Sequence, residues 1–128
     1  MDIRRPRAYF AAGEEMFNGQ TYTRFLNRLA RRYSDQEVFL VQDNARYHDA
    51  PEVQEWLACY GYRFHLVPLP KYSPDFNAVE RIWHHVRVNA THNRYFPTKE
   101  EFVSTLGGAL MDIERYPAQI AGYLHPFL

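Results

Sequence analysis

The sequence is short of cysteine, of long apolar runs and of net charge. Its single cysteine, Cys59, excludes a disulfide bond within the chain and suits a reducing cytoplasm, where we expect the protein to reside. No apolar run approaches the roughly 20 residues that a membrane helix needs. The basic residues near the N-terminus are not followed by an apolar stretch, so we predict no signal peptide.

The chain also has no excess of positive or negative charge. The 15 Lys and Arg residues balance the 15 Asp and Glu residues. Stand-alone nucleic-acid-binding domains usually carry a basic excess. The composition therefore argues against such a domain, but not against local basic clusters.

Apolar and aromatic residues are plentiful. Hydrophobic residues make up 46% of the 128 positions, which is typical of a globular protein with one substantial core. We predict that residues 1–128 form a single domain, without a separate DNA-binding domain.

Hydrophobic periodicity predicts alternating strands and helices. Strands are expected at 7–13, 37–41 and 62–69, and helices at 18–33, 49–61, about 77–90 and from 98 onward. The continuous apolar run at 37–41 is typical of a buried central strand. The order indicates an α/β domain with helices on a largely parallel sheet. Three strands are few for such a sheet, as if the chain began late in its fold.

Some local features can be predicted as well. Asp49 is expected to cap the helix that follows it, with Glu52 reaching back. Cys59 lies beside the apolar face of that helix and is expected in the core. The pair Gly107-Gly108 interrupts the last helix and is expected to pack close to a neighbour, because glycine weakens helices.

Two acidic residues follow the predicted strands. Asp43 comes directly after the strand at 37–41, and Glu80 opens the helix after the strand at 62–69, on the same flank as His84 and Arg87. In open α/β sheets functional groups gather beyond the carboxyl ends of the strands. Two carboxylates that converge there repel each other, and Mg²⁺ or Mn²⁺ would relieve the repulsion. Two such ions can promote phosphodiester cleavage.

Each acid also has a purely structural interpretation. Asp43-Asn44 could be a turn pair, since both residues favour turns. Asn77 and Glu80 have the spacing of a capping box, which would occupy the Glu80 carboxylate.

Histidines suggest another metal. His84 follows Glu80 at the i+4 position and His48 lies near Asp43 in the sequence, so a zinc site is an alternative. No further His or Cys completes a standard zinc pattern.

Basic residues and a tyrosine surround the second acid. They are Lys71, Tyr72, Arg81, Arg87 and Arg94. Cations interleaved with an aromatic ring suit a phosphate backbone and a stacked base. Taken one at a time, each is an ordinary solvated side chain.

Two segments carry a family resemblance. "VQDNARYHDA" at 41–50 and "LPKYSPDFNAVERIWHHVR" at 69–87 resemble the second and third catalytic blocks of DDE transposases of the insertion-sequence 630 and Tc1/mariner type. The similarity covers roughly residues 37–95. The shared positions are Asp43-Asn44-Ala45, His48, Tyr72–Asp75, Asn77, Glu80 and Trp83.

The resemblance implies an RNase H-like fold and DNA transposition. It implies that Asp43 and Glu80 are the second and third acids of a triad that holds two Mg²⁺ or Mn²⁺ ions. The supporting residues that it implies are Asn44, His48, Asn77 and His84. DNA would be the partner, at transposon ends and at the target.

The sequence departs from the family pattern in its N-terminal region. The first catalytic acid is expected on a strand well before Asp43, and Asp2 is too close to Asp43 to fill that place. We therefore expect an N-terminally truncated or split catalytic domain with little activity alone. The polypeptide partners that we expect are a second copy of the chain, in a homo-oligomer, or a complementing N-terminal polypeptide.

Two other functions stay open. The chain could be a non-catalytic module that keeps the fold and binds nucleic acid or protein. A stand-alone RNase H-like nuclease would need another acid beside Asp43 and Glu80.

Overall fold

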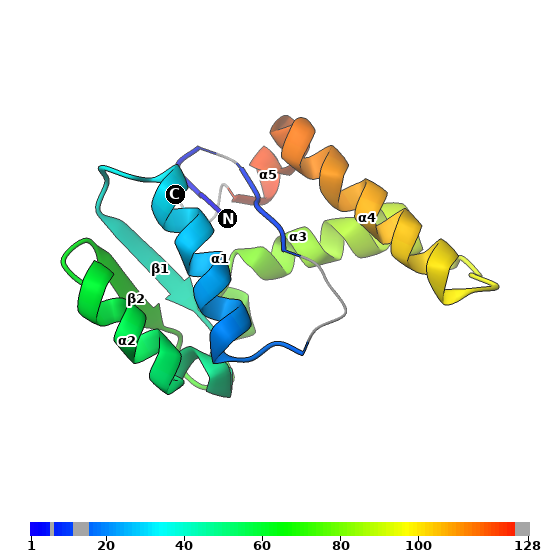
Figure 1. The fold of residues 1–128 in the computed structure, drawn as a ribbon. Helices are drawn as coiled ribbons and strands as arrows, with labels where there is room; N and C mark the ends of the chain where they lie inside the picture. Colours follow the sequence, from blue (N-terminus) through cyan, green and yellow to red (C-terminus); the bar gives the residue numbers. More distant parts are fainter. Residues whose placement is uncertain (6, 12–15, 125–128) are drawn as a thin grey trace. The chain divides into compact units, whose positions relative to one another are not determined.

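A computed structural model describes residues 1–5, 7–11 and 16–124 (Figure 1), which fall into two compact units. The sheet unit spans residues 11–77. The helical unit combines residues 1–10 with residues 78–128. No helix in the described ranges is long and apolar enough to cross a membrane.

The sheet unit is built on two parallel strands, β1 (Val38–Gln42) and β2 (Phe64–Pro68). The Leu69 N–H extends their pairing with a 2.9 Å hydrogen bond to the Gln42 carbonyl oxygen. Both strands predicted for this region are confirmed. Helices alternating with parallel strands agree with the predicted α/β class, and the RNase H-like fold stays a prediction.

Two helices complete this unit, α1 (Gly19–Arg32) and α2 (Pro51–Tyr60), and they pack against each other (Figure 1). Apolar side chains from both helices and from β2 are buried: Leu26, Leu29, Ala30, Val53, Trp56 and Phe64. The rings of Trp56 and Phe64 meet edge to face with 5.0 Å between centroids. The unit therefore has a core of its own.

Local sequence explains where α1 begins. The Asn18 side chain accepts a 3.0 Å hydrogen bond from the Thr21 N–H, and the Thr21 hydroxyl oxygen accepts a 2.8 Å bond from the Asn18 N–H. This reciprocal capping satisfies two N–H groups that the first turn leaves unpaired. The helix predicted over 18–33 is confirmed, with its arginines exposed on the face opposite the core.

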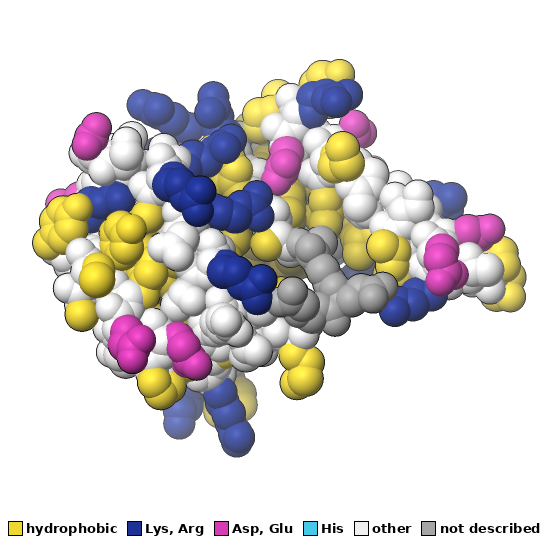
Figure 2. Space-filling model, in the orientation of Figure 1, with side chains coloured by type: hydrophobic (Ala, Val, Ile, Leu, Met, Phe, Trp, Pro, Cys, Tyr) yellow, Lys and Arg dark blue, Asp and Glu magenta, His cyan; other side chains and the backbone are white. Residues whose placement is uncertain are grey.

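β1 is less buried than the sequence predicts. Phe39 is 66% exposed and Val41 is 49% exposed. Successive side chains of a strand point to opposite faces, and in β1 one of those faces is open. Figure 2 shows hydrophobic side chains at the surface where Figure 1 draws the sheet.

Two predictions about α2 are wrong. Asp49 belongs to the preceding 3-10 turn η1 (Arg46–Asp49), and Ala50 is the N-cap, without a side-chain hydrogen bond. The reason is Pro51, which holds the residue before it in an extended conformation and so fixes the helix start. Cys59 is exposed rather than in the core.

The helical unit contains three α-helices and two short turns among its described residues. They are α3 (Val79–Val86), the π-helical turn η3 (Arg87–Thr91), α4 (Lys99–Arg115), the 3-10 turn η4 (Pro117–Ile120) and α5 (Ala121–Leu124). Its core is the buried cluster of Ala8, Ile82, Val86, Ala90, Ile113 and Ile120. As predicted, the Thr98 side chain caps α4, accepting a 3.2 Å hydrogen bond from the Glu101 N–H.

The strand predicted over 7–13 does not form within residues 7–11, and residues 12–13 lie outside the described ranges. Arg7 forms one isolated antiparallel bridge with Asp2, and Phe10 bonds to a side chain instead of to a sheet. The Phe10 N–H donates to the Glu114 carboxylate at 2.9 Å, and the Phe10 ring packs against Trp83. Ala8 fills the helical core.

The prediction for Gly107-Gly108 is also wrong. A methyl group added at either glycine would meet no atom within 4 Å among the described residues. The pair is therefore not required by close packing in this unit.

Candidate functional site

Asp43 lies directly after β1, at the end of the sheet where functional groups are expected. Because β1 and β2 are parallel, their carboxyl ends meet at one edge, which we call the carboxyl edge. The Asp43 side chain is 61% exposed there. It is thus open to an ion or a ligand from solvent.

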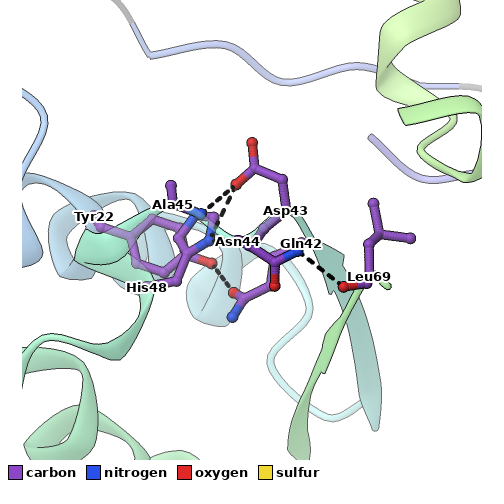
Figure 3. Close-up of polar contacts among 7 residues, drawn as sticks. All are labelled: Tyr22, Gln42, Asp43, Asn44, Ala45, His48 and Leu69. Carbon is purple, nitrogen blue, oxygen red and sulfur yellow. Dashed lines mark hydrogen bonds and ion pairs between the residues drawn. The ribbon is translucent and has the colours of Figure 1, made fainter. Parts of the chain in front are cut away.

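Two neighbours orient this carboxylate (Figure 3). The Ala45 N–H donates to Asp43 Oδ1 at 3.1 Å. His48 Nδ1 lies 2.8 Å from the Asp43 carbonyl oxygen and 3.3 Å from Oδ1. Both oxygens accept, so Nδ1 carries the proton. The second carboxylate oxygen points away from this cluster, which leaves it able to bind a cation.

His48 is held in turn by two tyrosines. Its buried ring lies 4.6 Å, centroid to centroid, from both Tyr22 and Tyr47. The Tyr22 hydroxyl donates a 2.7 Å hydrogen bond to Gln42 Oε1 at the end of β1 (Figure 3). This network ties α1 and the end of β1 to the loop that carries Asp43.

Burial keeps both phenols neutral. It is the main cause that raises the pKa of Tyr22 above its usual value of 10, and Tyr47 and Asp43 add to the effect. The pKa of Tyr47 is raised by burial first and then by Asp43. Both phenols therefore stay uncharged to a higher pH than an exposed tyrosine would.

Sequence patterns did not identify Tyr22 or Gln42 as members of the site. Tyr22 lies among the apolar residues of α1, where local pattern alone indicates a packing role. The signal that could have found it is its hydroxyl, because a buried tyrosine usually needs a hydrogen-bond partner.

Asn44 joins the two loops of the carboxyl edge. Its side-chain amide donates a 3.0 Å hydrogen bond to the Leu69 carbonyl oxygen, just after β2 (Figure 3). The Asp43-Asn44 turn that was weighed as an alternative does exist, since Asp43 accepts from the N–H two residues on. It occupies one carboxylate oxygen and leaves the other accessible.

The loop after β2 exposes two of the residues predicted to contact DNA. Lys71 is exposed, and the Tyr72 side chain is 99% exposed. Tyr72 has φ 57°, in the left-handed region that side chains rarely occupy. The Ser73 hydroxyl donates to the Lys71 carbonyl oxygen at 3.2 Å and closes this turn.

Glu80 belongs to the helical unit, in the first turn of α3, and is exposed. The N-cap of α3 is Ala78, without a side-chain hydrogen bond, so the capping box of Asn77 and Glu80 is not formed. The interpretation that ties up this carboxylate is therefore wrong. The convergence of Asp43 and Glu80 stays a prediction.

The remaining predicted residues divide between the units. Asn77 ends the sheet unit. In the helical unit Arg81, His84 and Arg87 are exposed, as is Glu80 itself. The roles assigned to these side chains stay predictions.

Asp2 has a structural contact of its own. Its Oδ1 accepts hydrogen bonds from the Arg4 and Arg5 N–H groups at 3.0 and 3.1 Å, which close a turn. This carboxylate is thus engaged by its own backbone.

The donor chemistry at Asp43 suits a hard cation. An exposed carboxylate oxygen is a ligand of the kind that Mg²⁺ and Mn²⁺ prefer. Within the described ranges, no group of three or more His, Cys, Asp or Glu side chains could hold a metal ion. Asp43 fits such an ion as one ligand of a set, and the zinc alternative stays a prediction.

Comparison with known proteins adds one finding. A family model described as DDE superfamily endonuclease matches residues 3–103, which is most of the chain and includes Asp43 and Glu80. No curated protein matches the sequence.

Proposed function

The chain belongs to the DDE superfamily of endonucleases, and from that premise we propose that it is part of a transposase catalytic domain with an RNase H-like fold. The proposed reaction is DNA transposition of the insertion-sequence 630 or Tc1/mariner type. The observation that supports it most is the exposed Asp43 carboxylate at the carboxyl edge. DNA is the substrate that membership of this family implies, and its members generally use divalent metal ions.

The reaction begins with hydrolysis of a phosphodiester bond at a transposon end. Water attacks the phosphorus, and the bond to the 3′-oxygen breaks to leave a 3′-hydroxyl. In strand transfer that hydroxyl attacks a target phosphate, and a target 3′-hydroxyl leaves.

We propose Asp43 and Glu80 as ligands of Mg²⁺ or Mn²⁺. When bound, such ions supply charge neutralisation and a more acidic hydroxyl nucleophile. His48 and the Ala45 N–H fix one Asp43 oxygen, and the other points away from these two donors (Figure 3). His48 therefore acts as a positioning residue, and Asn44 holds the two edge loops together.

Exposed cations would bind the DNA backbone. We assign this role to Lys71, Arg81 and Arg87, because Lys and Arg release counterions when they neutralise phosphates. Tyr72 adds an aromatic surface beside Lys71. Asn77 and His84 are proposed supporting residues near Glu80 in the sequence.

We expect the 128-residue chain to have little activity alone, because it contains two acids of the proposed triad. A complementing N-terminal polypeptide would supply the first acid, because a second copy of this chain carries only the same two acids. Mn²⁺-dependent nicking of supercoiled plasmid by the chain alone, abolished in Asp43→Asn, would contradict this expectation.

Metal-dependent DNA binding tests the proposal without requiring turnover. Mn²⁺ should tighten the binding of labelled duplex DNA, measured by fluorescence anisotropy, because it offsets repulsion between Asp43 and phosphate. Asp43→Asn removes that repulsion, so the variant should bind tightly without Mn²⁺ and no longer respond to it. Asp35→Asn, an exposed acid before β1, is the matched control and should respond like the wild type.

The alternative is a non-catalytic module that binds nucleic acid or protein. The observation in its favour is that no metal-binding group of three side chains occurs in the part of the chain that the structure describes. A module of this kind would bind its partner equally well after Asp43→Ala or Glu80→Ala. DNA binding that ignores both substitutions and Mn²⁺ would favour it over the nuclease.

A further inference from the structure

Tyr72 combines two features that are uncommon together. Its side chain is 99% exposed, and its backbone has φ 57°. The left-handed region is visited mainly by glycine and asparagine, because a β-carbon clashes there with the backbone. A bulky aromatic residue at this position is therefore held in a strained conformation while its ring contacts solvent.

Strain of this kind persists only where the surrounding structure imposes it. Here the turn is closed by the 3.2 Å hydrogen bond from the Ser73 hydroxyl to the Lys71 carbonyl oxygen. A second bond, from the Phe76 N–H to the Ser73 carbonyl oxygen at 3.2 Å, fixes the segment that follows. Pro70 restricts the segment before it. The ring is thus presented on a preorganised loop.

The loop is connected to Asp43. The Asn44 amide beside Asp43 bonds to the Leu69 carbonyl oxygen, and the Leu69 N–H bonds to the Gln42 carbonyl oxygen. These two bonds anchor the base of the Tyr72 loop to the residues on either side of Asp43. All of them belong to the sheet unit. Tyr72 and Asp43 therefore share the carboxyl edge.

An exposed ring beside a cation suits a nucleobase. Bases offer flat π faces that stack on aromatic side chains regardless of sequence, and Lys71 next to Tyr72 can pair with the adjoining phosphate. In an intact duplex the base faces are already stacked on one another. A ring that reaches into solvent from such a loop therefore needs a base outside the duplex stack, as in a single-stranded overhang.

We infer that Tyr72 stacks on an unpaired base next to the phosphate that approaches Asp43, so that the carboxyl edge prefers DNA with a single-stranded end. This inference rests on the proposed function, because it takes DNA as the substrate. It adds a preference for strand-separated DNA and assigns that preference to one ring.

The test compares two DNAs bound by the full chain. One is a blunt duplex, and the other has the same duplex with a short overhang that contains 2-aminopurine. The wild type should quench the 2-aminopurine fluorescence and bind the overhang DNA more tightly than the blunt duplex. Tyr72→Ala should lose the quenching and bind the overhang DNA about tenfold more weakly, with blunt-duplex binding unchanged.

Two further variants isolate the ring. Tyr72→Phe keeps the aromatic face and should retain both quenching and preference. Tyr62→Ala removes another exposed tyrosine, 77% exposed, at the amino end of β2, and should behave like the wild type. Melting curves of each variant show that the fold is intact.

The outcomes separate the two claims. If the wild type binds neither DNA, the proposed function and this inference both fail. If it binds both DNAs equally, or if Tyr72→Ala weakens both equally, the stacking role fails while the proposed function stands. Loss of the overhang preference in Tyr72→Ala and its retention in Tyr72→Phe would support the inference.

Discussion

The two ends of the small sheet are built in different ways. At the amino end Arg63 donates hydrogen bonds to the carbonyl oxygens of Ala30 and Tyr33 at 3.0 and 2.6 Å, where α1 ends. Its guanidinium also lies 4.9 Å from the centroid of the Phe64 ring. At the carboxyl end Asp43 and Tyr72 are exposed. One end closes the unit, and the other presents chemical groups to solvent.

This difference suggests where stability and function are located. Arg63 satisfies carbonyl groups that the last turn of a helix leaves unpaired, and its charge complements the helix dipole. The exposed groups of the carboxyl edge contribute little by burial, and Tyr72 is strained. Substitutions at the amino end should therefore cost stability, whereas those at the carboxyl edge should affect binding.

The largest effect is expected at Arg63. Arg63→Met should lower the free energy of unfolding by about 3 kcal/mol, because it leaves partly buried carbonyl oxygens without donors. Urea unfolding followed by circular dichroism measures it. Arg28→Met, at an exposed arginine of α1, is the control and should change stability little. Equal stability of the two variants would remove the contrast between the ends.

Tyr22 tests the support beneath Asp43. Tyr22→Phe removes the hydrogen bond to Gln42 and should cost about 1 kcal/mol at neutral pH. Burial raises the pKa of Tyr22 in the folded state above its unfolded value of 10. The stability that this neutral phenol contributes is therefore complete below pH 10 and is lost as the pH rises above it.

Unfolding measured from neutral to strongly alkaline pH should show this dependence. The wild type should lose stability steeply above pH 10, and Tyr22→Phe should lose it less steeply. Parallel curves would mean that Tyr22 ionises without hindrance and does not form the buried support described here.

Substitution of Tyr72 should increase stability, in contrast to the substitutions of Arg63 and Tyr22. Tyr72→Gly relieves the left-handed strain, which costs about 1–2 kcal/mol for residues with a β-carbon, although glycine also gains freedom in the unfolded chain. We expect a net stabilisation of up to about 1 kcal/mol, measured by urea unfolding. The same variant should lose the preference for overhang DNA. A destabilised Tyr72→Gly would show that the ring serves the fold.

The smallest stability effect is expected at Asp43. Asp43→Asn keeps the shape of the side chain and an oxygen that can accept from the Ala45 N–H, so unfolding should change by less than about 0.5 kcal/mol. A much larger loss in urea unfolding would place Asp43 among the structural residues, together with Arg63.

The sequence predicted much of the sheet unit. The apolar stripe of α1, the runs that became β1 and β2, and the position of Asp43 after β1 all follow from local pattern. The support around His48 does not, because it joins Tyr22 and Gln42 across about 20 residues of chain. Pairs of this kind are created by packing, which periodicity does not encode.

The errors have local physical causes. Asp49 has the sequence of a cap, but Pro51 fixes the helix start at Ala50. Residues 7–11 have the composition of a strand, yet the Phe10 N–H bonds to the Glu114 side chain of α4. In each case a competing contact prevails over local propensity.

Direct measurement of Mn²⁺ binding tests the central claim that Asp43 is a metal ligand of a DDE endonuclease. Mn²⁺ can be titrated into the wild type, Asp43→Asn and Asp35→Asn, with free Mn²⁺ measured by electron paramagnetic resonance. We expect the wild type and Asp35→Asn to bind Mn²⁺ alike and Asp43→Asn to bind it much more weakly. Equal binding by the wild type and Asp43→Asn would contradict that claim.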